Sequence, residues 1–339
     1  MVEVINPFDS GGYTLADLTS AIQILPNFYN KLGQMGLFRR EGTTQRTVII
    51  EQLDGALNLL PSVPVGGPST VGNRDVRSMR SFTIPHIPHD DVILPQDIQG
   101  IRAFGTFSAA DPLASVMNRK LERMRRKHDQ TLEYMEVNAL KGITKDGAGT
   151  TLYNWHTEFN YVKKTVDFVL GTTTTDIAGK CREVSRYLEA QLKGETMSTV
   201  TALVSPEFWD KFIAHSRVEK AYAYYLNTQQ PLRDDVRTGF KFHGINFVEY
   251  GGTVTLSTGA NEALLAANYG VAFPLGTSDV FTTYFAPANL IETVNTIGQP
   301  VYARQISRLD GRGIDLFTEA NPLPLVKRPD LVVEILSSN

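Results

Sequence analysis

The sequence predicts an α+β protein built from one long helix, one long β-hairpin and one inserted α/β unit. A helical pattern occupies residues 112–142, and β-branched runs flank a tip rich in proline and glycine between residues 47 and 94. Residues 176–276 alternate between helical and strand patterns. With 339 residues, the chain is long enough to bury a sizeable core in two linked units.

Composition and charge exclude several classes of protein. The chain is 42% hydrophobic and 20% charged, as expected of a folded protein. Its formal net charge of -3 excludes a generally basic protein that coats nucleic acid, so any affinity for phosphate must come from a local patch. The N-terminus lacks the pattern of a signal peptide, and no run of about 18 apolar residues occurs. We therefore expect a soluble chain that is made in a cytoplasm and does not enter a membrane.

The single cysteine, Cys181, cannot form a disulfide within the chain. It recurs at helical spacing with apolar neighbours, which are Ile177, Val184, Leu188 and Leu192. This spacing predicts a buried position in a helix. A catalytic thiol is the minor alternative.

The N-terminal part of the chain is predicted to contain a short amphipathic helical arm. Thr14 and Asp17 form a weak capping-box variant, and Leu15, Leu18 and Ile22 follow on one face. Residues 47–94 then predict an extended hairpin. Its tip contains too much proline and glycine to form a core, and an isolated two-stranded ribbon is marginal in water. The hairpin must therefore be stabilised by packing against residues outside itself.

The long helix has clear start and stop signals. Asp111 is a good N-cap with Pro112 at the first helical position, and Gly142 favours termination. Between them an apolar stripe repeats in steps of three and four residues. Its members are Leu113, Met117, Leu121, Met124, His128, Leu132, Met135 and Ala139. This stripe predicts one packed side along the whole helix.

Six of the nine residues from 119 to 127 are basic. On a helical wheel Arg119, Arg123 and Arg126 fall opposite the apolar stripe, whereas Lys120 and Lys127 flank it. The simpler interpretation is a solvated helix face. In that case nearby acids would form ion pairs along the helix, namely Glu122, Asp129, Glu133 and Glu136.

The rest of the chain predicts an insertion. The segment TLYNWHTEFNYVKKTVDFVL alternates aromatic and polar residues as a half-buried strand does. Residues 176–276 follow as a compact α/β unit, and the remaining strands end with LVVEIL. We expect these last strands to return to the sheet beside the long helix. The α/β unit would then be an insertion between two halves of another domain.

No pattern of catalytic or metal-binding residues stands out. His86, His89, Asp90 and Asp91 could hold a metal, but the intervening prolines extend the backbone and no second ligand group follows. The segment GITKDGAGT lacks the lysine and hydroxyl residue of a phosphate-binding loop. His156, His215 and His243 each stand alone, and no nucleophile elbow or dinucleotide fingerprint occurs. We therefore predict no catalytic residue, no metal and no cofactor.

The order of several segments resembles the tailed-phage major capsid proteins, in particular the lambda-like E-protein family with the Hong Kong-type capsid fold. These segments are YTLADL, IPHIPHDDV, the arginine-rich helix, SPEFWDKFIAHSRVEKAY, KFHGINFVEYGG and NPLPLVKRPDLVVEIL. The resemblance covers most of the chain and implies a structural subunit, not an enzyme. It implies an N-terminal arm (1–46), an extended hairpin loop (47–94), a peripheral domain with a spine helix (95–175 and 277–339) and an axial domain (176–276).

The resemblance also implies partners. Copies of the chain would assemble as pentamers and hexamers into an icosahedral head around double-stranded DNA. The basic side of the spine helix would face the lumen, with Arg119, Arg123 and Arg126 toward the DNA and Lys120 and Lys127 beside them, and would bind phosphate without reading sequence. The hairpin would lie across a neighbouring subunit through Leu57, Leu59, Leu60, Val63 and Val65.

Further partners follow from the same resemblance. We expect no fused scaffold, because the sequence shows no long acidic or coiled-coil segment at its N-terminus, and therefore expect a separate scaffolding protein, with a portal and a decoration protein as further partners. The protein would reside in the virion and, during assembly, in the host cytoplasm. Two alternatives stay open: a cellular encapsulin-like shell around a protein cargo, and a metal-dependent hydrolase that uses the histidines and aspartates at residues 86–91.

Overall fold

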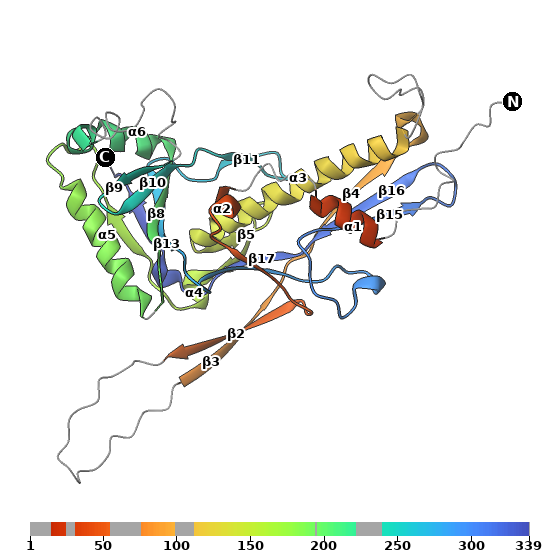
Figure 1. Ribbon diagram of the computed structural model, residues 1–339, viewed down its shortest axis with the longest axis horizontal. Coiled ribbons are helices and arrows are strands. Elements are labelled where there is room, and N and C mark those ends of the chain that lie inside the picture. The colour runs from red at the N-terminus through yellow and green to blue at the C-terminus, as the bar shows by residue number, and fades with distance from the viewer. Residues whose placement is uncertain are drawn as a thin grey trace, which may run out of the picture.

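The computed structural model is an elongated body from which a two-stranded ribbon projects (Figure 1). Helix α3 (Pro112–Leu140) runs along one edge, and a unit of sheet and helices lies at the end where the helix finishes. The predicted α+β class is confirmed. The structure describes residues 15–24, 31–54, 76–98, 112–193, 195–221 and 239–338.

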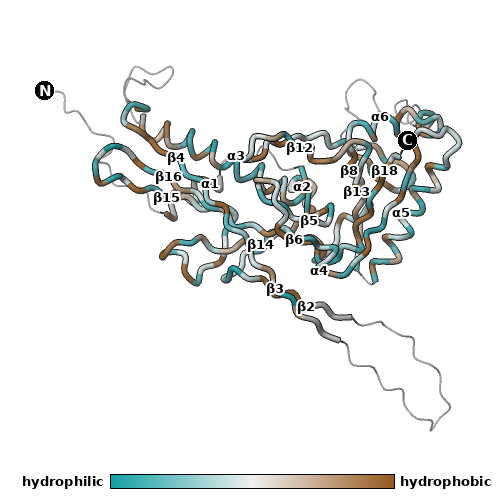
Figure 2. The backbone as a smooth tube through the Cα atoms, turned by 180° about the vertical axis from the view of Figure 1, so that it is seen from behind, coloured by the Kyte–Doolittle hydropathy of each residue, from teal (hydrophilic) through white to brown (hydrophobic). Residues whose placement is uncertain are grey.

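Helix α3 packs along the stripe that its sequence predicts. All eight stripe residues are buried, from Leu113 near the start to Ala139 in the last turn. In Figure 2 hydrophobic and hydrophilic segments alternate along this helix. The helix ends two residues before Gly142, whose φ of 85° is left-handed and whose added Cβ would lie 2.0 Å from Nε2 of His156. Glycine is therefore required at this stop. The predicted N-cap, Asp111, lies outside the described residues.

A six-stranded mixed sheet forms the core of the end unit. Its order is β7-β18-β13-β8-β10-β9. The strands are β7 (Lys164–Asp167), β18 (Val333–Leu336), β13 (Tyr269–Leu275), β8 (Thr199–Val204), β10 (Ile245–Glu249) and β9 (Phe240–Phe242). Along β8 the side chains alternate between two cores. Ala202 and Val204 pack with helices α5 (Ile177–Leu192) and α6 (Pro206–Ala214), whereas Leu203 packs with the end of α3.

The strand order of this sheet shows that the predicted position of the last strand is wrong. Strand β18 was expected beside the long helix, but it pairs with β13 on one side and with β7 on the other. Segments from outside the predicted insertion, 164–167 and 333–336, therefore complete its sheet. The alternating pattern of LVVEIL does predict a strand, but tertiary pairing decides which sheet the strand joins.

Cys181 confirms its predicted place in the core of this unit. The side chain is fully buried on α5 together with Ile177, Val184 and Leu188. Burial raises the pKa of the thiol to about 12, which leaves it protonated near neutral pH.

Two smaller sheets support the rest of α3. The first has the order β15-β16-β4 and packs against the first half of the helix and against α1 (Leu15–Ile24). The second has the order β1-β14-β17 and joins the N-terminal segment to the body. The strands of both are β15 (Tyr302–Ser307), β16 (Ile314–Ala320), β4 (Ile87–Ile93), β1 (Arg39–Gly42), β14 (Phe281–Phe285) and β17 (Pro322–Val326).

The projecting ribbon is shorter than the predicted hairpin. Strand β2 (Thr47–Asp54) pairs with β3 (Val76–Thr83), and the chain then leaves the ribbon to form β4 in another sheet. At its base Phe82 packs edge-on against Trp155, with ring centroids 5.2 Å apart. The hydroxyl of Tyr153 also donates to the carbonyl of Thr83 at 2.8 Å. Within the described residues, only the base of the ribbon therefore packs against the body of its own subunit.

Short elements complete the fold. The strand expected after the long helix is interrupted by one of them, the short helix α4 (Trp155–Glu158). Asn154 caps this helix, and its side chain accepts a hydrogen bond from the backbone N–H of His156. The others are α2 (Lys31–Gln34), β5 (Ile143–Lys145), β6 (Thr151–Asn154), β11 (Thr253–Thr255), β12 (Asn261–Ala263) and the 3₁₀ turns η1 (Pro95–Asp97), η3 (Ile291–Thr293) and η4 (Pro329–Leu331).

Candidate functional surfaces

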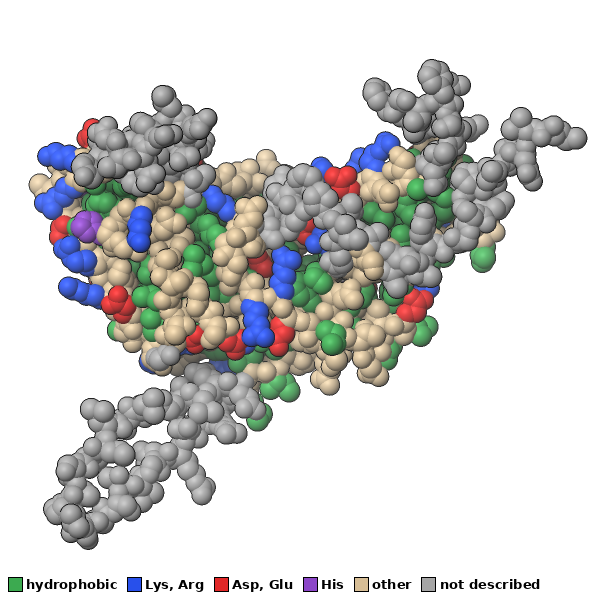
Figure 3. Space-filling model, viewed as in Figure 1, with side chains coloured by type: hydrophobic (Ala, Val, Ile, Leu, Met, Phe, Trp, Pro, Cys, Tyr) green, Lys and Arg blue, Asp and Glu red, His purple; other side chains and the backbone are tan. Residues whose placement is uncertain are grey.

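Three arginines form an exposed basic face on α3. Arg119, Arg123 and Arg126 are all exposed, as the helical wheel predicts. Blue side chains stand along the part of the surface that this helix forms (Figure 3). Arg126 makes an ion pair with Glu122 one turn earlier. The face can therefore meet an anionic partner without rearranging the core.

The two lysines predicted to flank this face have partners within the subunit. The ammonium group of Lys120 donates to Oδ1 of Asp91 at 3.1 Å and to the carbonyl of Val92, so it fastens α3 to β4. Burial opposes ionisation of Asp91, but the hydrogen bonds from Val92 and Lys120 hold the pKa of this carboxyl below its ordinary value. Lys127 is exposed, and its Nζ lies 3.0 Å from Nε2 of His89. Lys120 therefore serves packing, and Arg119, Arg123 and Arg126 carry the open basic face.

A second polar side of α3 is buried and was not predicted. Arg125 is 5% exposed and Asp129 is 4% exposed, and Nε of Arg125 lies 3.0 Å from both carboxylate oxygens. A guanidinium N–H also donates to the carbonyl of Ile22 on α1, at 3.4 Å. The i, i+4 spacing of this pair was visible in the sequence, but nothing local shows that α1 covers it.

Glu133 ties three distant segments together. Its Oε1 accepts from the backbone N–H groups of Lys31 and Leu32, at 3.1 and 3.3 Å, and from the hydroxyl of Tyr250 at 2.7 Å. Burial raises the pKa of Glu133 in spite of these bonds. The interpretation of this residue as a solvated ion-pair partner is therefore wrong. It joins α3 to α2 and to the turn after β10.

Glu136 is also buried and not solvated. It is 1% exposed, and its Oε1 accepts from the hydroxyl of Thr283 on β14 at 2.8 Å. Burial raises the pKa of Glu136 to about 8, helped by the nearby charge of Glu133 and opposed by the bond from Thr283. The carboxyl group is thus largely protonated at neutral pH.

Glu136 predicts a pH-dependent stability. Because its folded pKa lies above the ordinary value of 4.5, the stabilisation is complete below that pH and is lost as the pH rises to about 8. We expect the free energy of unfolding to fall by up to about 1.4 kcal/mol per pH unit in this window. Glu136→Gln keeps a similar shape but cannot titrate, so it should flatten the decline. Chemical unfolding of the unassembled subunit across this window measures the effect.

The control for this experiment is Glu122→Gln on the exposed side of the same helix. It should keep the decline of the unchanged chain. An equal decline in the Glu136→Gln protein would show that the buried carboxyl is not its source.

The apolar residues predicted to bind a neighbour, Leu57, Leu59, Leu60, Val63 and Val65, lie outside the described residues. The base of their hairpin is fixed by Glu319 on β16. Its Oε1 lies 2.9 Å from Nδ1 of His86 and 3.4 Å from a guanidinium nitrogen of Arg46. These two residues stand just outside the ends of the ribbon. Glu319 therefore links both ends of the hairpin to the body.

Three of the four candidate metal ligands point to different partners. His86 faces Glu319 and Asn321, His89 faces Lys127, and Asp91 faces Lys120. Among the described residues, no group of three or more histidine, cysteine or acidic side chains is arranged to hold a metal ion. The geometry of these residues thus serves packing between β4, α3 and β16.

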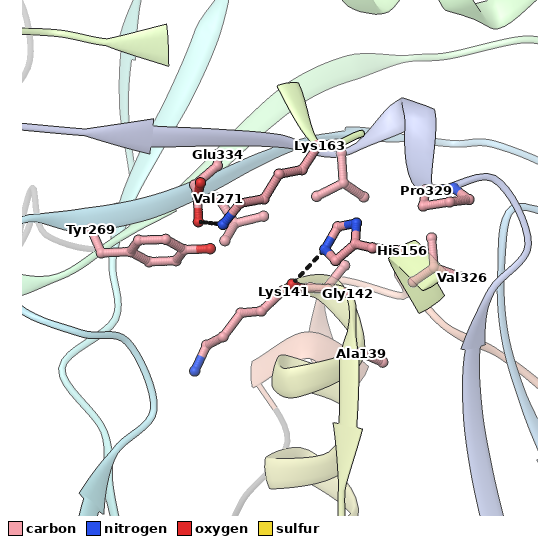
Figure 4. Close-up of a pocket in the computed structure, with 12 residues that line it drawn as sticks. Ala139, Lys141, Gly142, His156, Lys163, Tyr269, Val271, Val326, Pro329 and Glu334 are labelled. Atoms are coloured by element: carbon pink, nitrogen blue, oxygen red, sulfur yellow. Dashed lines mark hydrogen bonds and ion pairs between the residues drawn. The ribbon is translucent and has the colours of Figure 1, made fainter. Parts of the chain in front are cut away.

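A small cavity lies where the end of α3 meets the six-stranded sheet (Figure 4). It encloses about 20 Å³, enough for one water molecule but far below the roughly 300 Å³ of a substrate pocket. One ring nitrogen of His156 lies 3.3 Å from the carbonyl of Lys141, whose side chain points away from the cavity. Lys163 forms an ion pair with Glu334 at 2.8 Å. The cavity is therefore a small gap between packed side chains and not a binding site for a substrate.

No helix in the described part of the chain is both long enough and apolar enough to span a membrane.

Comparison with known proteins gives consistent matches over nearly the whole chain. Residues 14–336 match the family of phage major capsid protein E. The major capsid protein of Pseudomonas phage KPP10 is 34% identical, covering 97% of this chain and 98% of that protein. The major capsid protein of Salmonella phage Felix O1 is 29% identical, covering 95% and 96%.

Solved capsid structures share the fold. The mature capsid of bacteriophage PhiM1 gives a TM-score of 0.51 at 12% identity and covers 89% of this chain and 85% of its own. The capsid of cyanophage A-1(L) gives 0.51 at 13% identity and covers 91% and 93%. The expected Hong Kong-type capsid fold is therefore confirmed.

Proposed function

This chain belongs to the phage major capsid protein E family, and from that premise we propose how its copies build a head. It is a phage major capsid protein, a structural subunit that assembles with copies of itself in the virion capsid. We propose that these copies group into pentamers and hexamers around double-stranded DNA. The observation that carries the proposal is a match to capsid relatives over nearly the full chain, on a fold shared with capsid structures.

The match favours a phage capsid over the alternatives left open by the sequence. The relative at 34% identity is a phage major capsid protein, not a cellular shell or a hydrolase. The family role is structural, and we propose that the chain has no enzymatic one.

We propose a division of labour among the parts. The N-terminal arm (1–46) holds α3, the hairpin loop reaches a neighbouring subunit, and the axial unit surrounds the five-fold and six-fold axes. The strand pairing supports an axial unit that takes in β7 and β18 as well as residues 176–276. The peripheral domain then comprises α3 with the sheets that pack along it.

We propose that Arg119, Arg123 and Arg126 face the lumen and contact packaged DNA. Their exposure on one side of a firmly packed helix supports this role. Packaged DNA presents dense phosphate, and binding that does not depend on sequence needs only positive charge. Lys127 would add to this charge, whereas Lys120 is occupied by Asp91.

Changing all three arginines to glutamine should leave closed shells but weaken their retention of DNA. Losing about three phosphate contacts per subunit should make the plot of log binding constant against log salt concentration less steep by about 2.7. DNA released from purified particles is measured against salt concentration. A charge-conserving control changes the same three residues to lysine and should retain DNA almost as the unchanged chain does. Failure of the glutamine protein to form any shell would place these residues at a subunit contact and not in the lumen.

Other partners belong to the same proposal. We propose a separate scaffolding protein and a portal, with a decoration protein as a further candidate, and assembly in the host cytoplasm. These follow from the role of a head subunit and not from a particular surface of the chain.

A further inference from the structure

The loop between β14 and β15 exposes three large aliphatic side chains. Ile291 is 93% exposed, Val294 65% and Ile297 68%, and they recur at intervals of three residues. Scattered apolar residues are normal on a protein surface, but three in seven residues form a concentrated group. We call Ile291, Val294 and Ile297 the apolar knob.

The loop turns the side chain of Thr293 inward and leaves its other polar side chains exposed. Thr293, between the exposed residues, is 3% exposed, and its hydroxyl donates to the carbonyl of Ala288 at 2.7 Å. The hydroxyl of Thr296 donates to the carbonyl of Thr293 at 2.8 Å. Asn295 adopts a left-handed conformation with φ of 60°, which asparagine tolerates better than most residues. The aliphatic side chains are therefore held outward by a folded loop.

The body of the subunit holds the end of this loop. The backbone N–H of Gly298 donates to the carbonyl of Thr43 at 2.8 Å, and the hydroxyl of Tyr302 donates to the carbonyl of Ile297 at 3.3 Å. A Cβ on Gly298 would lie 2.0 Å from the carbonyl oxygen of Phe285, so the packing here allows only glycine. Because the loop is already ordered, covering the knob would cost little conformational entropy.

The position of the knob continues the surface proposed to reach other subunits. Thr43 precedes β2 by four residues, so the loop is attached beside the base of the hairpin. The ribbon also exposes apolar side chains near this base, because Ile49 is 63% and Met79 66% exposed. In Figure 1 the loop lies on the ribbon side of α3 and far from α5 and α6. If the axial units meet at the centre of a capsomer, the knob stands at its outer edge.

We propose that the apolar knob is a contact between capsomers and that its partner is a second copy of this chain. A head built from one major subunit must form its lateral contacts from that subunit's own surfaces. The rim of the knob is polar, with Glu292 lying 3.8 Å from Arg304 in a loose ion pair. An ordered apolar centre with a polar rim is the usual anatomy of a protein–protein interface. This inference rests on the proposed head architecture and adds a specific contact to it.

The test changes Ile291, Val294 and Ile297 together to serine. The subunit should keep its circular dichroism spectrum and melting temperature, because all three side chains are exposed. Capsomers should still form, but the yield of closed particles should fall by about tenfold or more. The matched control swaps isoleucine and valine within the knob (I291V, V294I, I297V), which keeps its apolar character. This control should close as the unchanged chain does.

A labelling experiment identifies the occupant. The one native thiol, Cys181, is buried, so Val294→Cys adds a single accessible site. We expect its rate of alkylation to drop by about tenfold between free capsomers and particles that contain only this polypeptide. Normal closure of the serine protein, or equal labelling in capsomers and particles, would overturn the contact. Protection that appears only when a scaffolding or decoration protein is present would assign the knob to that partner instead and would also overturn it. Failure of the unchanged chain to form particles would contradict the proposed function and not this contact alone.

Discussion

Replacing residues 58–74 with a short Gly-Ser turn is expected to leave a folded subunit that no longer closes into particles. The ribbon contacts its own subunit through its base, where Phe82 meets Trp155 and Tyr153. Removing the tip should therefore spare the core. Interfaces gain about 25 cal/mol per Å² of apolar surface that they bury, and the shortened chain lacks four of the apolar residues proposed to cover a neighbour. Circular dichroism, a thermal melt and negative-stain microscopy report folding and closure separately.

Two sequence variants locate this effect. Changing Leu57, Leu59, Leu60, Val63 and Val65 to serine should reproduce the loss of closure. Changing Ser62, Ser69 and Thr70 of the same segment to alanine should not. Particles of normal size from the shortened protein would show that the hairpin is not a clamp between subunits.

Arg125→Met is expected to destabilise the unassembled subunit by about 3–5 kcal/mol, because it leaves a buried carboxylate without its partner. Asp129 is 4% exposed, and burial already raises its pKa while the charge of Arg125 lowers it. The substitution also removes the bond to the carbonyl of Ile22. Chemical denaturation gives the change in the free energy of unfolding. The double variant Arg125→Met, Asp129→Leu should recover much of the loss, since apolar pairs often replace buried ion pairs without penalty.

The adjacent residue provides the matched control. Arg126 also pairs with an acid one turn away, but its side chain is 47% exposed. Arg126→Met should therefore change stability by no more than about 1 kcal/mol. Equal effects of the two substitutions would show that burial does not set the strength of the Arg125–Asp129 pair.

The sequence was most informative where local spacing decides the outcome. The apolar stripe of α3 depends only on helical periodicity, so its buried side could be predicted residue by residue. The exposure of Arg119, Arg123 and Arg126 follows from the same geometry. The end of the helix near Gly142 could also be predicted from a local signal, because the left-handed conformation there favours glycine.

Local spacing could not predict contacts that join distant parts of the chain. Glu133 looks like a surface acid on the helix, and it is buried because Lys31, Leu32 and Tyr250 supply its hydrogen bonds from more than 100 positions away. Lys120 turns inward because Asp91 lies beside it on β4. Strand β18 joins the six-stranded sheet for the same kind of reason, since the pairing edges of β7 and β13 are created only by the fold.

Electron cryomicroscopy of particles formed by the expressed chain, with its scaffolding protein where one is identified, tests the proposed head architecture most directly. We predict closed shells in which subunits group in fives and sixes around the axial unit, with residues 47–83 of each copy lying over a neighbour. A discrete small oligomer in which this segment folds back on its own subunit would contradict the proposal.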